Sequence, residues 1–338
     1  MNQLEIEEYL DKLAEQTGSE IEEVIVKRLK VIQNRIAQMY AKYADSDGEL
    51  SWTDINKYNR FQKEMKQITK ELNADYRYII KKLQKSNENI YLEGFMRHMY
   101  LYEMATGKGM YVSIPSTETI KGILLNPIAE LTLSKIFEQH RNEIVRKINI
   151  ELGQGIQAGE GYATMAKRIE KTVGFSRNKA RRVARTEGGR ARTIAGEEAE
   201  KKASKHVDIT SVWMSALDLR VRHSHRVLDG QKTDDEGYFH YRSWKAKAPH
   251  LWGIPSMDIN CRCVKLRLVN GMLPEYRRGR DYMDPEYQRK LADRIEKYMA
   301  DDARTYKQAL KRAKREIKPP STTMLYTTFD DWYKKHAL

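Results

Sequence analysis

Apolar side chains recur at steps of three and four residues through the first part of this chain, and this spacing constrains the fold most. One stripe occupies residues 21–43 and another occupies 55–83. Such steps place side chains on one face of a helix, and that face must pack against another element. The sequence therefore predicts an elongated helical region over residues 1–154. The first stripe consists of Ile21, Val24, Ile25, Leu29, Ile32, Ile36, Met39, Tyr40 and Tyr43.

A small α+β core domain is predicted for residues 155–270. It begins with a glycine-punctuated loop and a short helix in GQGIQAGEGYATMAKRI, and a long helix follows from about Ser176, a suitable N-cap, to residue 205. Small side chains on one helix face, such as Ala180 and Ala184, indicate close packing. After His206 the segments VDITSVWMSA and CRCVKLRLV alternate as β-strands do, with a helix at about 218–228 and a short strand near YFHY between them.

Residues 271–338 are predicted to form a basic C-terminal helix and a tail. Asp284 and Pro285 are a cap followed by a first-turn proline, and the helix is expected to run to Pro319. The aromatic residues near the end, Phe329 and Trp332 among them, suit a docking tail. The predicted fold class is mainly α, with an elongated helical N-terminal region, a small α+β core domain and the basic C-terminal helix.

The chain carries 61 Lys and Arg against 47 Asp and Glu, a net charge of +14 that favours an anionic partner. The positive charge is concentrated in two segments. Residues 167–205 hold thirteen Lys or Arg against five acids, and residues 277–318 hold fourteen against eight. Because no base-reading motif accompanies them, we expect non-specific contacts with double-stranded DNA.

Four arginines of the predicted 176–205 helix are candidates for these DNA contacts. At 100° per residue they fall within about 80° of one another. A solvated basic face is the alternative interpretation. The four are Arg177, Arg181, Arg185 and Arg192.

A His/Cys segment permits three interpretations. His223 and His225 with Cys261 and Cys263, the two cysteines of the chain, are four zinc-type ligands. Alternate residues of a helix diverge, however, so only one histidine of the predicted helix would point inward. We therefore expect no bound metal and no cofactor. Zinc is the one metal whose presence should be tested.

The second interpretation is catalytic, with Cys261 or Cys263 as nucleophile, His225 as base and Asp229 as orienter. It would make the chain a metal-dependent nuclease or a transferase. The third is structural and is preferred: Gly230 ends the helix in the left-handed conformation, and His225 packs or hydrogen-bonds against the cysteine strand. Arg185, Thr186 and Glu187 lie mid-helix among small residues, where a salt-bridged packing role is preferred to an active site.

Three sequence segments together resemble a known family. They are ARTEGGRARTIAGEEAEKKA, then the pattern W…D.RVR.SHR.LDGQ, then P…G.P…INCRC with Pro255 in its centre. This combination resembles the phage Mu F-like minor head proteins, the head-morphogenesis proteins of tailed bacteriophages. The resemblance covers about residues 155–270.

The resemblance implies a virion protein present in few copies, made in the host cytoplasm and associated with the portal vertex inside the capsid. Its implied partners are the phage portal protein and other head proteins, and its implied role is procapsid assembly or DNA packaging and delivery. Such a protein is no enzyme, although some relatives carry toxin enzymes after this core.

The family often carries Cys-x-x-Cys before the Leu-Asp-Gly turn and His-x-x-Cys-x-Cys at the end, which together resemble a zinc site. Here Arg222 and His225 replace the first pair and Asp258 replaces the later histidine, so the resemblance does not carry a metal over. The acidic N-terminus indicates no signal peptide, and no apolar run approaches the roughly 20 residues that cross a bilayer. We therefore expect no membrane partner.

Overall fold

The computed structural model describes residues 2–46, 48, 50–51, 53, 55, 59–110, 113–125, 133–269, 276–302 and 305–336. The chain divides into two compact units. The first comprises Met1–Val207 and Ala248–Cys261, and the second comprises Asp208–Lys247 and Arg262–Leu338. The fold is mainly α with a small α+β region, as predicted. The predicted core domain over 155–270 is divided between the units, because its long helix packs with the N-terminal helices.

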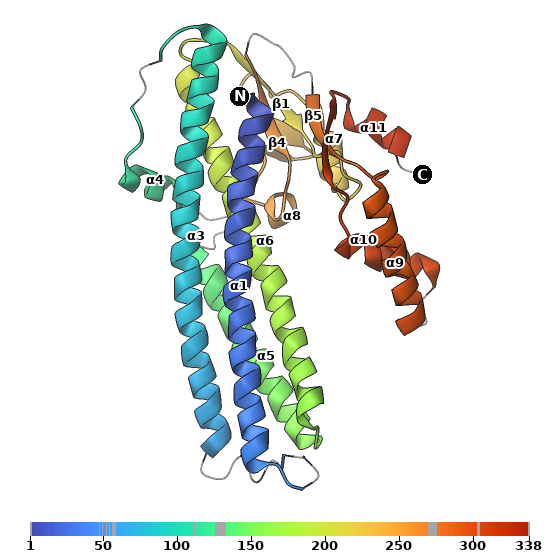
Figure 1. The fold of residues 1–338 in the computed structure, drawn as a ribbon. Coiled ribbons are helices and arrows are strands. Elements are labelled where there is room, and N and C mark those ends of the chain that lie inside the picture. The colour runs from blue at the N-terminus through green and yellow to red at the C-terminus, as the bar shows by residue number, and fades with distance from the viewer. Residues whose placement is uncertain are drawn as a thin grey trace. The chain divides into compact units, whose positions relative to one another are not determined.

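Long helices dominate the first unit, and α1, α3 and α6 lie side by side (Figure 1). Its elements are α1 (Gln3–Tyr43), α3 (Arg60–Thr106), α4 (Thr117–Leu124), α5 (Leu133–Gln157), α6 (Tyr162–Ala203) and the short α8 (Pro255–Asp258). The core uses the two predicted apolar stripes: Ile32 and Ile36 of α1 and Ile79 of α3 are buried together with Phe137 of α5. The N-terminal helices and α6 therefore share one bundle.

The predicted helix start at Ser176 is wrong. Helix α6 begins at Tyr162, with Gly161 as its N-cap, and continues through position 176. Met165 and Ile169 of its first turns are fully buried in the bundle core. Their burial outweighs the cost of about 1 kcal/mol that an internal glycine such as Gly174 imposes on a helix.

Small residues let α6 approach its neighbours closely, as the sequence predicts. Ala180, Ala191 and Ala195 are fully buried. At Gly188 the approach to α1 and α3 is close, since an added Cβ would lie 2.7 Å from Cβ of Ala14 in α1 and 3.5 Å from Ile90 in α3. A methyl group there would force two helices apart.

Gly188→Ala is therefore expected to lower the free energy of unfolding of the first unit by about 1–3 kcal/mol, because overpacking outweighs the better helix propensity of alanine. Urea denaturation followed by circular dichroism measures the change. Gly153→Ala in α5 is the matched control: an added Cβ meets no atom within 4 Å there. That variant should gain up to about 1 kcal/mol. Equal effects of the two variants would contradict the close approach.

The described residues of the second unit form three two-stranded antiparallel sheets. Strand β1 (Ile209–Met214) pairs with β4 (Val264–Val269), β2 (Phe239–Tyr241) with β3 (Trp244–Ala246), and β5 (Tyr276–Arg280) with β6 (Ser321–Leu325). The helices are α7 (His223–Leu228), α9 (Pro285–Asp302), α10 (Tyr306–Glu316) and α11 (Phe329–His336). The strands expected on either side of the Leu-Asp-Gly turn thus pair with each other.

The C-terminal region differs from the prediction of one long helix. Helix α9 begins at Pro285 as expected, and the Asp284 carboxylate accepts the Tyr287 N–H at 2.7 Å. It ends at Asp302, and α10 starts anew behind a capping box formed by Thr305 and Gln308. This Thr-x-x-Gln signal is visible in the sequence and predicts the second helix start.

The aromatic residues of the predicted docking tail pack within their own unit. Phe329 and Trp332 of α11 are buried with Leu217 and Val221. Among the residues that the structure describes, no helix is long and apolar enough to span a membrane.

Candidate functional site

The Leu-Asp-Gly turn follows α7 and lies against strand β1. Gly230 has a φ of +80°, the left-handed conformation that the sequence predicts for this helix end. The Gly230 N–H donates to the Trp213 carbonyl at 2.9 Å, and the Trp213 N–H donates to the Gln231 carbonyl at 2.8 Å. These two bonds fix the turn beside β1 and direct the Asp229 side chain into the unit.

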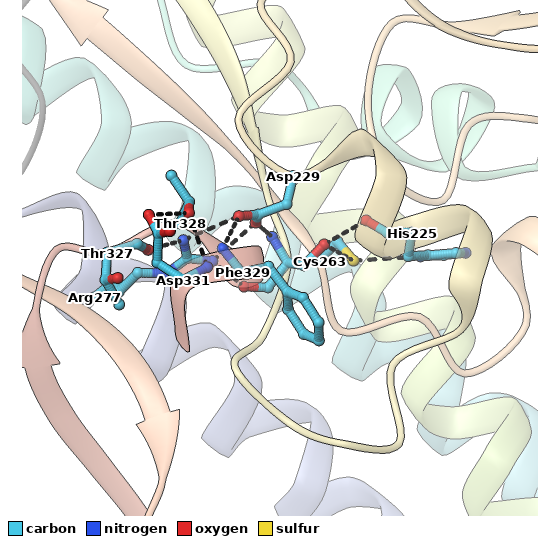
Figure 2. Close-up of polar contacts among 9 residues, drawn as sticks. His225, Asp229, Cys263, Arg277, Thr327, Thr328, Phe329 and Asp331 are labelled. Carbon is cyan, nitrogen blue, oxygen red and sulfur yellow. Dashed lines mark hydrogen bonds and ion pairs between the residues drawn. The ribbon is translucent and has the colours of Figure 1, made fainter. Parts of the chain in front are cut away.

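Asp229 lies at the centre of a buried polar cluster (Figure 2). Its carboxylate forms a bidentate ion pair with Arg277 of β5, at 2.9 Å from Oδ1 to Nη2 and 3.2 Å from Oδ2 to Nη1. The two side chains are 2% and 0% exposed. The carboxylate also accepts the backbone N–H groups of Ser215 and Phe329, each at 2.7 Å. Asp229 therefore holds three segments of the chain together.

The same cluster fixes the C-terminal segment. Arg277 donates to the Thr327 carbonyl at 2.6 Å and to the Ser215 carbonyl at 2.5 Å. Thr328 caps α11 by accepting the Asp331 N–H at 3.2 Å, and Asp229 takes the N–H of Phe329, the first residue of that helix. A carboxylate at a helix N-terminus is favourable, because unpaired N–H groups and the helix dipole converge there.

His225 and Cys263 form a second buried contact in this unit. His225 Nδ1 lies 3.3 Å from Cys263 Sγ, and the Ser215 hydroxyl donates to the His225 carbonyl at 2.6 Å. The Trp213 ring packs against the imidazole at a centroid distance of 5.8 Å. His223 is exposed, so one histidine of the pair points inward, as the helical spacing predicts.

The ring nitrogen and the thiol are ligand types that zinc accepts, and a structural zinc site takes four such ligands. His225 and Cys263 supply two of these within the second unit, and Cys261 is buried as well. The expectation of no bound metal stays a prediction, and elemental analysis of the purified protein checks it. For catalysis the arrangement is unfavourable, since His225 and Cys263 are both buried and Asp229 is bonded to Arg277 and two backbone N–H groups.

Asp218 and Arg262 form another ion pair, which sequence reasoning missed. Asp218 also accepts the Tyr282 hydroxyl at 3.0 Å and the Arg220 N–H at 2.8 Å. Burial acts to raise the pKa of Asp218, but the charge and hydrogen bond of Arg262, together with the hydrogen bonds from Arg220 and Tyr282, lower that pKa below its usual value. Arg262, the central residue of the Cys-Arg-Cys motif, thus fixes the position of Asp218, the first residue of the Asp-Leu-Arg-Val-Arg motif.

The Arg-Thr-Glu motif belongs to the first unit and holds the loop before Cys261. The Thr186 hydroxyl donates to the Arg182 carbonyl at 2.8 Å and accepts the Asn260 N–H at 2.9 Å. Glu187 pairs with Arg190 at 3.2 Å in a buried position. These contacts support the packing role over an active site.

Hydrogen bonds within the loop itself fix the rest of its conformation. Pro255 begins the short α8, and the buried Asp258 carboxylate accepts the Trp252 and Ile254 N–H groups, each at 3.2 Å. Gly189 leaves room for the loop, since an added Cβ would lie 2.6 Å from the His250 ring. Asp258, which stands where the family often has histidine, thus stabilises the loop in this chain.

The structure describes the side chains of three of the four α6 arginines predicted to contact DNA, and each of the three is paired with an acid. Arg192 is 3% exposed and pairs with Glu7 at 2.9 Å and with Asp11, so it belongs to the bundle interior. Arg181 pairs with Glu22 and Arg185 with Glu15, both at 3.2 Å. The Arg177 side chain lies outside the described residues. Pairing with α1 therefore neutralises the described part of this stripe.

Ser215 and Arg277 complete the cluster around Asp229, and neither was identified from the sequence. Arg277 stands in the run YRRGR, where no pattern distinguishes one arginine from the next. Ser215 contributes mainly backbone groups, which every residue has. Tertiary packing alone selects these two positions.

Comparison with known proteins places the motifs in a wider context. The family model described as Phage Mu protein F like protein matches residues 146–266, from α5 to β4. The minor head protein of Bacillus phage SPP1 is 37% identical over 280 residues, which cover 82% of this chain and 91% of that protein. No solved structure matches.

A second relative has an enzyme's name. An NAD(+)–arginine ADP-ribosyltransferase of Enterococcus faecalis is 28% identical over 208 residues, covering 60% of this chain. The match spans 43% of that protein, so more than half of the transferase has no counterpart in the alignment.

Proposed function

Because this chain belongs to the family of phage Mu F-like minor head proteins, we propose that it acts at the portal vertex inside the capsid. There it binds the portal protein and other head proteins through its helical unit, and it makes sequence-indifferent contacts with packaged DNA. Its role is in procapsid assembly or in DNA packaging and delivery.

One observation carries the proposal of a protein partner. Met96, Tyr100 and Met104 of α3 are 42%, 50% and 63% exposed and follow one another at four-residue steps. They therefore form one apolar stripe on a helix whose opposite face is packed in the bundle. Exposed aromatic and Met side chains grouped in this way are typical of protein interfaces.

Co-purification of the full chain with the portal protein of the same phage tests this proposal. We expect Tyr100→Ser combined with Met104→Ser to reduce capture at least about tenfold, since buried anchor residues contribute 2 kcal/mol or more. Tyr78→Ser is the matched control, because Tyr78 is equally exposed on α3 at 51% but lies outside the stripe. Absence of capture by the wild-type chain would overturn the portal assignment.

A structural role without enzymatic activity is part of the proposal. The similarity to the transferase favours the rival interpretation, whereas the buried His225 and Cys263 offer an incoming substrate no exposed nucleophile. Incubation of the purified chain with NAD⁺ and an arginine analogue separates the two. Formation of an ADP-ribosylated product that is lost in Cys263→Ser would favour the enzyme.

A further inference from the structure

Among the described helices of the second unit, α10 carries the largest net positive charge. Residues 305–318 contain six Lys or Arg and one acid. Five of the six lie on α10, and four of these five are exposed and, at 100° per residue, lie within about 100° of one another on the helix. We call these four the basic face: Lys307, Lys311, Lys314 and Arg315.

Packing against α9 directs the basic face outward. Ala309 and Ala313 lie on the opposite side of α10 and are fully buried with Leu291 and Ile295 of α9. Because alanine side chains allow close approach, the rotation of α10 about its axis is fixed. The capping box at Thr305 fixes the start of the helix.

The single acidic residue of residues 305–318 contacts α9 and does not neutralise the basic face. Glu316 pairs with Arg294 of α9 at 2.9 Å and accepts the Tyr298 hydroxyl. Arg312, the fifth basic residue of α10, stacks on the Tyr298 ring at 4.0 Å and so faces α9 as well. Within the described parts of the chain, no ion pair joins a side chain of the basic face to an acid. In this respect α10 differs from α6, whose Arg181, Arg185 and Arg192 are paired.

We propose that the basic face of α10 is the surface through which the protein binds the phosphates of double-stranded DNA. The proposal rests on the DNA contacts of the proposed function and assigns them to these residues. From the first to the last cation the face is about 12 Å long, at 1.5 Å per residue, and duplex DNA carries one charge per about 1.7 Å. Lysine ammonium groups bind phosphate as point charges and read no base, so the binding is indifferent to sequence.

Fluorescence anisotropy of a short labelled duplex, titrated with the full chain at several salt concentrations, measures this binding. Lys311→Gln combined with Lys314→Gln removes two charges from the basic face while retaining residues of similar helix propensity. We expect the slope of log affinity against log salt to become shallower by about 1.8, since each phosphate contact contributes about 0.9. The factor by which affinity falls between about 50 and 200 mM salt is then about 12-fold smaller for the variant than for the wild-type chain.

Arg289→Gln combined with Lys290→Gln is the matched control. It changes the net charge equally on the neighbouring helix α9, where the two cations are exposed but pair with Asp293 and Glu286. We expect its salt slope to equal that of the wild-type chain. Circular dichroism of both variants confirms that the helices are retained.

The outcomes separate the two proposals. If the wild-type chain fails to bind duplex DNA at low salt, the DNA contacts of the proposed function are wrong and this inference falls with them. If it binds and the α10 variant keeps the wild-type slope, the inference alone is overturned. If polyglutamate displaces the duplex better than an unlabelled duplex of equal charge does, the basic face is a site for an acidic protein instead.

Discussion

Replacing Asp229 with alanine is expected to lower the free energy of unfolding of the second unit by about 3–5 kcal/mol. The change leaves the Arg277 guanidinium, which is 0% exposed, without its carboxylate partner. It also removes the acceptor of two backbone N–H groups, those of Ser215 and Phe329. Urea denaturation followed by fluorescence of the buried Trp213 and Trp332 measures the loss.

The same variant should free the C-terminal segment, since Asp229 and Arg277 together hold residues 327–329. Limited proteolysis is expected to cut within residues 317–328 faster than in the wild-type chain. Asp235→Ala is the control: Asp235 is an exposed aspartate of the same unit, and its loss should change stability by no more than about 0.5 kcal/mol. A loss below about 1 kcal/mol for Asp229→Ala would contradict the central role of this ion pair.

Arg192→Met should lower the free energy of unfolding of the first unit by a similar amount, about 3–5 kcal/mol. Arg192 pairs with Glu7 at 2.9 Å, and the Glu7 side chain is 5% exposed, so the variant leaves a buried carboxylate uncompensated. His98 Nε2, also buried, lies 3.5 Å from the same carboxylate. Urea denaturation followed by circular dichroism of the helices measures the effect.

Arg181→Met on the same helix is the matched comparison. Arg181 forms an ion pair of the same kind with Glu22 of α1, but its side chain is 47% exposed. Exposed pairs contribute about 0–1 kcal/mol, because water and salt screen them. If both variants lost the same free energy, burial would not be what distinguishes Arg192, and its assignment to the bundle interior would be wrong.

Much of the fold follows from the sequence because it depends on local periodicity. Three- and four-residue steps place Ile32 and Ile79 in a helical core, and alternation places Val212 and Leu266 in paired strands. The start of α9 at Pro285 is equally local, since a cap and a proline act within one turn. The start of α6 was missed because burial of Met165 and Ile169 decides it, and burial depends on distant helices.

The candidate site likewise has features that follow from local sequence and features that depend on distant residues. The left-handed Gly230 and the inward-facing His225 follow from the turn and from helical spacing. The partners of Asp229 do not, since Arg277 and Phe329 lie 48 and 100 residues away along the chain. No local sequence pattern predicts which distant arginine neutralises a buried carboxylate.

The mainly α class, the Leu-Asp-Gly turn and the membership of a phage head protein family can all be read from the amino-acid sequence. Which positive charges remain for a partner depends instead on tertiary packing. The arginines of α6 and the cations of α10 have similar spacing in the sequence, yet Arg192 is buried against α1 and Lys311 faces solvent. The physical reason is that the effect of a charge depends on its desolvation and its nearest opposite charge, and both are set by elements distant in the sequence.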